Sequence, residues 1–202
     1  MIYLENIGKN AKKAFEDLKS VEHSKIKRVL ENYNKSLFIN KNKIIKTELT
    51  TPDTISIHKY LQILKKNKID NVIIEASSHS LDQDRLHHIN FKSAIFTNFS
   101  QDHLDYHKNM KSYLNAKLIL FKKILKKNAN VVLDKNIDEF SVLKNITKRK
   151  SLKLVEINKT IKKIENISWC VNNIFKKKNL AMAVSATRLC GLKDNFFFKS
   201  LE

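Results

Sequence analysis

Short apolar runs that end in small polar residues recur through the middle of the chain. NVIIEASSH at 71–79 and FKSAIFTNFS at 91–100 both have this form, and ANVVLD at 129–134 and KLVEI at 153–157 repeat the apolar run. Buried strands of parallel sheets have such patterns because helices cover both of their faces. Helical stretches lie between the runs, one of them extending to about residue 148. The alternation predicts an α/β fold with a mostly parallel sheet flanked by helices.

Two further helices are predicted from their end signals. The sequence TTPDT at 50–54 is a helix start in which Pro52 suits the first turn. A last helix is predicted from about 174 to 189, with Gly191 as its C-terminal stop. One face of this last helix is predicted to carry Leu180, Ala183, Val184 and Thr187.

Composition places the chain among globular proteins. With 202 residues, of which 42% are apolar, it can bury a core of its own. The sequence has no apolar run of the ~18 residues that a membrane span needs, and no signal-type block at its start, so we expect a cytoplasmic protein without membrane insertion. Cys170 and Cys190 lack metal-ligand or redox spacing and are predicted to be reduced thiols.

The formal charge of +19 raises the question of nucleic-acid binding. Lys and Arg total 39, but only four are Arg, the residue that recognises bases and phosphates with two parallel hydrogen bonds. The lysines are spread through every segment together with many Asn and Ile. This distribution indicates a general compositional bias, and we expect no specific nucleic-acid partner.

The first polar cluster, EASSHSLDQDR at 75–85, follows a predicted strand. In open α/β sheets ligands bind where the strands end. Glu75 could reach a metal ion from such a position. Side chains that could hold an anionic ligand follow it: Ser77, Ser78, His79, Gln83 and Arg85. A polar strand-to-helix loop with a capping serine explains the same letters equally well.

The second cluster, TNFSQDHLDYH at 97–107, follows the next predicted strand. His103 and His107 are four residues apart, a spacing that places metal ligands on one helix face, although such pairs are common by chance.

From Asn109 onward the sequence predicts an amphipathic helix that carries Lys117 on its apolar face. The other residues of that stripe are Met110, Leu114, Phe121 and Leu125. Burying an unpaired ammonium costs several kcal/mol. Lys117 therefore either extends to water, or its amine is functional, as a cation paired with phosphate or as a metal-binding carbamate.

Four stretches, in this order, closely resemble the central domain of Mur ligases, which build peptidoglycan precursors. They are TTPDT, IIEASSHSLDQDR, TNFSQDHLDYHKNMKSYLNAK and IFKKKNLAMAVSATRLCG. The resemblance covers about residues 45–192, is densest from 75 to 121, and points to the ligases that add the third residue of the stem peptide. It implies the family's central-domain fold, here incomplete, because the strand and helix of the phosphate-binding loop have no match.

The resemblance implies roles for ten positions. Glu75 and His103 match magnesium ligands, and Lys117 matches a lysine that is carbamylated in the family, so these three are the predicted catalytic residues. A carbamate held by magnesium would explain why Lys117 interrupts an apolar stripe. Asn98 and His107 lie in the family signature near the nucleotide. Contacts with the nucleotide-sugar peptide are implied for Thr50, Thr51, Ser77, Gln83 and Arg85.

The family chemistry explains why metal ligands cluster. ATP phosphorylates the terminal carboxylate of a UDP-MurNAc-dipeptide, and the amine of an amino acid then displaces the phosphate to form an amide. Mg²⁺ is the implied cofactor, because it screens the repulsion between the carboxylate and the γ-phosphate of the co-substrate ATP. The implied partners are UDP-MurNAc-L-Ala-D-Glu, ATP and a diamino acid, either diaminopimelate or lysine. A monomer is expected.

The sequence departs from the family at the ATP site. Mur ligases bind ATP through a GxxGKT loop whose backbone amides surround the phosphates. The only glycines are Gly8 and Gly191, and IGKNAKKAF at 7–15 lacks the second glycine and the hydroxyl after the lysine. This fragment is not expected to be the phosphate-binding loop.

Residues outside the resemblance complete the predicted domain organisation. Residues 1–44 form an N-terminal segment without a family match. Residues 10–33 have helical spacing, and residues 36–49, which extend past this segment, look like short strands. Residues 193–202 are predicted to begin the connection to a C-terminal domain.

Together these features predict a partial Mur ligase whose isolated chain lacks amide-ligase activity. Two alternatives remain open: a non-catalytic remnant that keeps a weak substrate contact, and, less favoured, a basic nucleic-acid-binding module. The substrate affinity of an Arg85→Ala variant separates the partial ligase from the non-catalytic remnant. Nucleic-acid affinity that survives moderate salt would favour the nucleic-acid-binding module.

Overall fold

The computed structural model describes residues 49–164 and 173–191. These residues belong to two compact units, which divide between Glu75 and Ala76.

Several sequence predictions fall outside the described residues. They are the helices of 10–33, the short strands of 36–49 up to residue 48, and the connection at 193–202.

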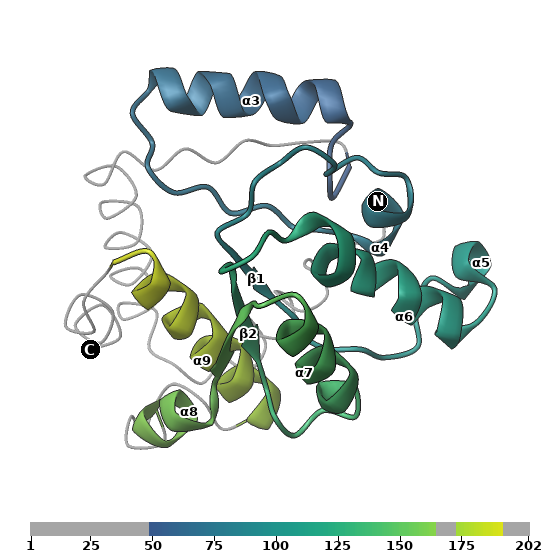
Figure 1. Ribbon diagram of the computed structural model, residues 1–202, viewed down its shortest axis with the longest axis vertical. Helices are drawn as coiled ribbons and strands as arrows, with labels where there is room; N and C mark the ends of the chain where they lie inside the picture. Colours follow the sequence, from purple (N-terminus) through teal and green to yellow (C-terminus); the bar gives the residue numbers. More distant parts are fainter. Residues whose placement is uncertain (1–48, 165–172, 192–202) are drawn as a thin grey trace, which may run out of the picture. The chain divides into compact units, whose positions relative to one another are not determined.

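The first unit contains the helix α3 (Thr54–Lys66), drawn in blue in Figure 1. Asp53 is its N-cap, and its Oδ1 accepts a hydrogen bond from the Ser56 N–H at 2.9 Å. Pro52 therefore precedes the cap, and its predicted place in the first turn is wrong. The helix buries Ile57 and Leu64, which are seven residues apart and so lie on one face.

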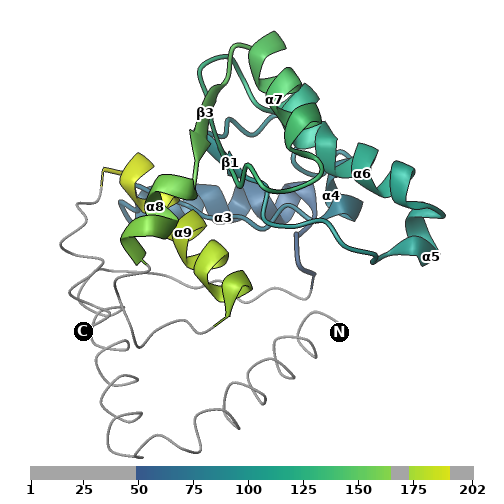
Figure 2. The same ribbon diagram turned by 90° about the horizontal axis from the view of Figure 1, so that it is seen from below.

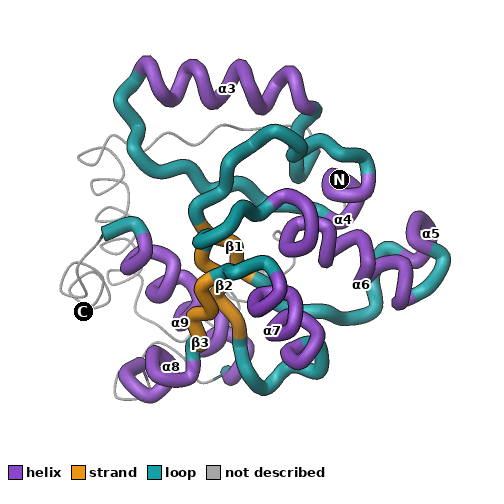
Figure 3. Tube along the Cα trace, in the orientation of Figure 1, coloured by secondary structure: helices purple, strands orange, loops and turns teal. Residues whose placement is uncertain are grey.

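The strand predicted at 71–75 is absent. These residues form neither helix nor strand, and Figure 3 draws the segment after α3 as a loop. Ile73 is 95% exposed, and Val72 is exposed as well. An apolar run forms a strand only when a neighbouring strand accepts and donates its hydrogen bonds, so sequence pattern alone overpredicted it.

The second unit is built on a parallel sheet of β1 (Ser93–Ile95), β2 (Asn130–Leu133) and β3 (Lys153–Glu156), in that order. Ala94 aligns with Val131, which aligns with Leu154. The three strands predicted after residue 90 are confirmed, and so is the α/β class with a parallel sheet flanked by helices.

Helices connect the strands and cover both faces of the sheet. In both ribbon views α9 and α7 lie on opposite sides of the strands (Figures 1 and 2). Parallel strands require such crossover connections, which bury both faces. In the described part of this unit the α-helices are α4 (Ser78–Asp82), α5 (Leu104–His107), α6 (Met110–Ile119), α7 (Phe140–Arg149), α8 (Asn158–Ile164) and α9 (Ile174–Leu189).

The core of this unit is centred on β2, where Val131, Val132 and Leu133 are fully buried. Side chains alternate across a strand, and Val132 packs in the cluster formed by α8 and α9. The other buried members of that cluster are Ile157, Ile164, Ala181, Met182 and Val184. On α9 the predicted apolar face is partly wrong, because Val184 is buried but Ala183 is exposed.

Helix α9 ends as predicted. Gly191 has φ +84°, and its N–H bonds to the carbonyl of Arg188 at 3.0 Å. A left-handed residue just past a helix end is the usual stop signal, and glycine adopts this conformation without strain. At the other end the Asn173 side chain accepts from the Phe175 N–H at 2.8 Å.

Helix α6 continues into a π-helical turn, η2 (Leu120–Ile124). Its wider hydrogen bonding is seen where the Leu125 N–H bonds to the carbonyl of Leu120 at 2.9 Å. Such turns are rare and frequently occur at functional sites. Phe121 and Leu125, at the end of the predicted stripe, are buried as expected.

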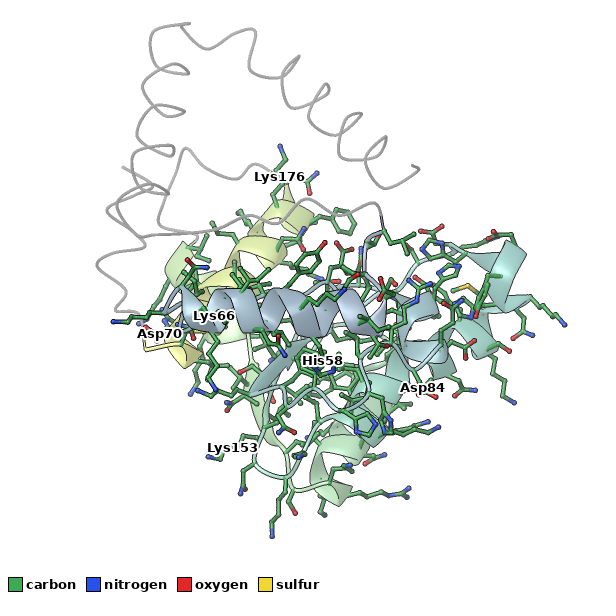
Figure 4. The ribbon with its side chains drawn as sticks, turned by 90° about the horizontal axis from the view of Figure 1, so that it is seen from above. His58, Lys66, Asp70, Asp84, Lys153 and Lys176 are labelled. Atoms are coloured by element: carbon green, nitrogen blue, oxygen red, sulfur yellow. The ribbon has the colours of Figure 1, made fainter. Side chains whose placement is uncertain are left out.

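Charged side chains are distributed over many elements. Lys153 on β3 and Lys176 on α9 extend outward in Figure 4, and α6, α7 and α8 each carry exposed lysines as well. Within the described ranges, no helix combines the length and the apolar character needed to cross a membrane.

Candidate functional site

Helices α4 and α5, with the start of α6, bring five aromatic side chains together, which we call the imidazole cluster. Its members are His79, His103, Tyr106, His107 and Tyr113. The His79 ring centroid lies 4.9 Å from that of His103 and 5.4 Å from that of His107. Both polar clusters found in the sequence therefore contribute to one place in the second unit.

Local backbone features position these rings. Ser77 is the N-cap of α4, and its Oγ accepts from the Ser80 N–H at 3.2 Å, so the predicted capping serine is confirmed. His103 has a left-handed backbone with φ 54°, which turns the chain into α5. Its N–H donates to Oδ1 of Asp102 at 2.8 Å, and its Nε2 lies 3.5 Å from Asp102 Oδ2.

A buried hydrogen bond joins α4 to α5. His107 Nε2 lies 2.9 Å from the hydroxyl of Ser78, and both side chains are buried. His107 also stacks on Tyr113, with ring centroids 5.3 Å apart. These contacts give His107 a definite structural role, and its proximity to a nucleotide stays a prediction.

Burial and mutual repulsion change the acidity of the cluster. Desolvation lowers the pKa of His79, and the neighbouring His103 lowers it further. Desolvation and then His79 lower the pKa of His107 in the same way. Desolvation, followed by the charge of Asp102, raises the pKa of the Tyr113 hydroxyl. Both histidines thus favour the neutral form, in which a ring nitrogen can accept a hydrogen bond or bind a metal.

Gln83 and Arg85 form a connected pair after α4. The Gln83 Oε1 accepts from the Arg85 Nε at 2.9 Å and from one of its terminal nitrogens. The Gln83 amide in turn donates to the Tyr106 hydroxyl at 3.3 Å. The side chains of Gln83 and Arg85, both predicted to contact an anionic substrate, are therefore hydrogen-bonded to each other. Tyr106 on α5 holds the Gln83 amide through its hydroxyl.

Lys117 lies beside aromatic rings. Its Nζ is 5.2 Å from the ring centroid of Tyr113 and 5.9 Å from that of Phe96, and the side chain is half-buried. Aromatic faces attract an ammonium through their quadrupole, which answers part of the question raised by a cation in an apolar stripe. The centroid of the His103 ring lies 5.9 Å from that of Tyr113, so two of the predicted catalytic residues are neighbours of one ring.

Three of the predicted residues belong to the first unit. Thr51 is buried, and its Oγ1 donates to the carbonyl of Glu75 at 2.6 Å. Thr50 and the Glu75 side chain are exposed. Glu75 is in one unit and His103 with Lys117 in the other, so the metal site predicted for these three residues stays a prediction.

Asn98 is exposed in the loop after β1, where its Oδ1 accepts a hydrogen bond from the Thr97 hydroxyl at 3.5 Å. Among residues 49–164 and 173–191, no group of three His, Cys, Asp or Glu side chains is arranged to hold a metal ion.

Sequence reasoning missed Tyr106, Tyr113 and Phe96 as members of the site. Tyr106 falls inside the quoted DYH triplet, and a signal was therefore present. Tyr113 lies four residues before Lys117 and faces the same side of α6, a relation that helical spacing could have revealed. Phe96 is far from Lys117 in the sequence, and only the fold brings its ring close to the Lys117 amine.

Comparison with known proteins identifies the family. Residues 20–191 match the Mur ligase middle domain. The match covers most of the chain and takes in residues 20–44, which belong to the segment 1–44 predicted to have no family match. The chain therefore belongs to the Mur ligase family.

Several curated relatives share one name, UDP-N-acetylmuramoyl-L-alanyl-D-glutamate--2,6-diaminopimelate ligase. The protein of Rickettsia montanensis is 37% identical over 176 residues, covering 76% of this chain and 36% of the relative. That of Clostridium botulinum is 41% identical over 121 residues, covering 60% and 24%. That of Lawsonia intracellularis is 49% identical over 84 residues, covering 42% and 17%. The chain thus spans about a third or less of the length of these relatives.

Proposed function

We propose that the chain is the middle-domain part of a cytoplasmic, ATP-dependent amide ligase that adds diaminopimelate to UDP-MurNAc-L-alanyl-D-glutamate. The observation that carries the proposal is that Lys117 and His103 both lie close to the Tyr113 ring, at 5.2 and 5.9 Å from its centroid, with Arg85 and Gln83 in the same unit. The name that these relatives share favours diaminopimelate over lysine.

The substrate contacts follow from charge. The precursor carries a diphosphate and carboxylates, and a guanidinium binds such groups with two parallel hydrogen bonds. Arg85 supplies that guanidinium, Gln83 supplies a polar group beside it, and Ser77 is proposed as a further contact. In this proposal Thr50 and Thr51 contact the same substrate, and Asn98 and His107 lie near the nucleotide.

The donor set proposed for magnesium is Glu75, His103 and a carbamate on Lys117. Asp102 stands beside His103, as carboxylates do beside metal-binding imidazoles, and carboxylate and carbamate oxygens are hard ligands suited to Mg²⁺. Bound there, the metal would screen the repulsion between the substrate carboxylate and ATP.

The proposed reaction has two steps. A carboxylate oxygen of the dipeptide attacks the γ-phosphorus of ATP, and ADP leaves. The amine of diaminopimelate then attacks the acyl carbon, phosphate leaves, and the nitrogen loses a proton. The role of this chain's residues is to hold the carboxylate and orient it, since correct placement alone lowers such barriers substantially.

Binding of UDP-MurNAc-L-Ala-D-Glu tests the proposed function without requiring turnover. Titration calorimetry on the full chain should detect the precursor, and Arg85→Ala should weaken binding about 10- to 100-fold, because a charge-assisted pair contributes roughly 1.5–3 kcal/mol. Arg149→Ala removes the same charge from an exposed site on α7 and serves as the control. Equal affinities of the wild type and Arg85→Ala would indicate a remnant without a working pocket.

Carbamylation of Lys117 has its own readout. A neutral amine and CO₂ give a carbamate and a proton, and ¹³C NMR in labelled bicarbonate would show the carbamate carbon. Carbamylation removes the positive charge that the rings of Tyr113 and Phe96 attract, and this loss disfavours the carbamate. Bound Mg²⁺ would compensate by stabilising the carbamate anion, so we expect the signal to grow when Mg²⁺ is added. Lys117→Arg should abolish the signal and Lys111→Arg, on the same helix, should keep it. A wild-type spectrum without this signal in the presence of Mg²⁺ contradicts the assignment.

A further inference from the structure

Tyr106 connects the two parts of the candidate site through its hydroxyl and its ring. The hydroxyl donates to Oδ2 of Asp82 at 3.0 Å and accepts from the Gln83 amide at 3.3 Å. Tyr106 is on α5, whereas Asp82 and Gln83 are at the end of α4, so these bonds link residues far apart in the sequence.

The hydroxyl determines how the Gln83 amide is turned. An amide offers donors on one side and an acceptor on the other. Because its nitrogen faces Tyr106, its oxygen faces Arg85 and accepts two bonds from the guanidinium. These two bonds hold one edge of the guanidinium against Gln83 and so restrict its plane, in which all five of its N–H donors lie.

The ring of Tyr106 makes separate contacts with the imidazole cluster. Its centroid lies 4.2 Å from that of His79 and 4.7 Å from that of His107. A phenylalanine would keep these contacts and lose only the hydroxyl bonds. The two functions of the side chain can therefore be tested separately.

We propose that Tyr106 is a positioning residue that orients Arg85, through Gln83, for the anionic groups of the nucleotide-sugar peptide. The proposal rests on the proposed function for its ligand, and on the hydrogen-bond chain from Asp82 to Arg85 for its geometry. The four side chains lie at or near the surface, where single hydrogen bonds contribute little to folding. The hydroxyl accordingly affects ligand affinity more than stability.

The test compares Tyr106→Phe with the wild type in the full chain. Calorimetry with UDP-MurNAc-L-Ala-D-Glu should show affinity about 3- to 10-fold weaker, a loss equivalent to about one neutral hydrogen bond to the ligand. The thermal midpoint should stay unchanged. Tyr60→Phe, on α3, removes a hydroxyl elsewhere and should leave both values as they are.

A second measurement needs no ligand. In ¹⁵N NMR of the free protein the Arg85 Nε–H, assigned with Arg85→Lys, should be ordered in the wild type and mobile in Tyr106→Phe. Unchanged order of this group in Tyr106→Phe overturns the proposal, and so does unchanged affinity where the wild type binds. If neither the wild type nor Arg85→Ala binds the precursor, the proposed function fails, and the order of the Nε–H still decides whether Tyr106 positions Arg85.

Discussion

Around β2 the side chains of Val131, Val132 and Leu133 are fully buried, whereas around α4 and α5 those of Gln83 and Tyr106 are exposed. The first region, the β2 core, is held by apolar burial, which contributes about 25 cal/mol per Å² and has no preferred direction. The second, the α4–α5 corner, comprises residues 77–88 and 103–109. It buries Leu81 and Leu86, but directed hydrogen bonds and ring contacts hold its candidate site side chains.

The backbone differs as well. Four of the seven described non-glycine residues with positive φ lie in the corner, namely Asp84, His88, His103 and Lys108. Such conformations cost roughly 1–3 kcal/mol each when the residue is not suited to them, and they occur preferentially at functional sites. The comparison teaches that the β2 core supplies stability, and that the corner uses some of that stability to hold side chains in fixed directions.

Truncation in the core should have the largest effect. Leu143 on α7 is fully buried, and Leu143→Ala should lower the free energy of unfolding by about 2–5 kcal/mol, because methyl groups are lost and a cavity remains. Val142, its neighbour on the same helix, is 43% exposed, and Val142→Ala should change stability by less than about 0.5 kcal/mol. Denaturant unfolding measures both. Similar losses for the two variants would show that the apolar core is not the main source of stability.

The sequence predicted the core far better than the corner. Periodicity and end signals located all three strands and the helix from 174 to 189, because burial repeats along a chain with the period of the element. It failed at 71–75, where a strand needs a partner that its own letters do not specify. In the corner it identified His103, Gln83 and Arg85 as candidates. The orientation of Gln83 depends on Tyr106, which comes 23 residues later, and no local pattern contains that information.

Removing an ion pair next to the β2 core is expected to have the second-largest effect. Asp134 directly follows β2 and is fully buried, and Lys178 Nζ on α9 lies 2.7 Å from its Oδ2. Lys178→Met leaves that carboxylate without its cation, and we expect a loss of about 2–3 kcal/mol, below the full value for a buried pair because Lys178 is partly exposed.

The control for this pair is Lys176→Met, which removes an exposed lysine from the same helix and should be nearly neutral. Thermal unfolding compares the two variants. A Lys178→Met protein as stable as the wild type would mean that polar bonds in the core resemble those of the corner, where each contributes little.

The smallest effect, of opposite sign, is expected in the corner. Lys108 has φ 65° and ψ −36°, outside the regions that favour a lysine, and its N–H bonds to the carbonyl of Leu104 at 2.9 Å. Lys108→Gly keeps this bond and relieves the strain, so stability should rise by about 0.5–1 kcal/mol after the added freedom of the unfolded chain is subtracted. Lys111→Gly, within α6, should instead destabilise the protein by about 1 kcal/mol.

If the strained turn at Lys108 fixes the orientation of α5, the more stable Lys108→Gly protein should bind UDP-MurNAc-L-Ala-D-Glu less tightly than the wild type. A loss of stability in Lys108→Gly would show that this turn is not strained, and the contrast between core and corner would then rest on burial alone.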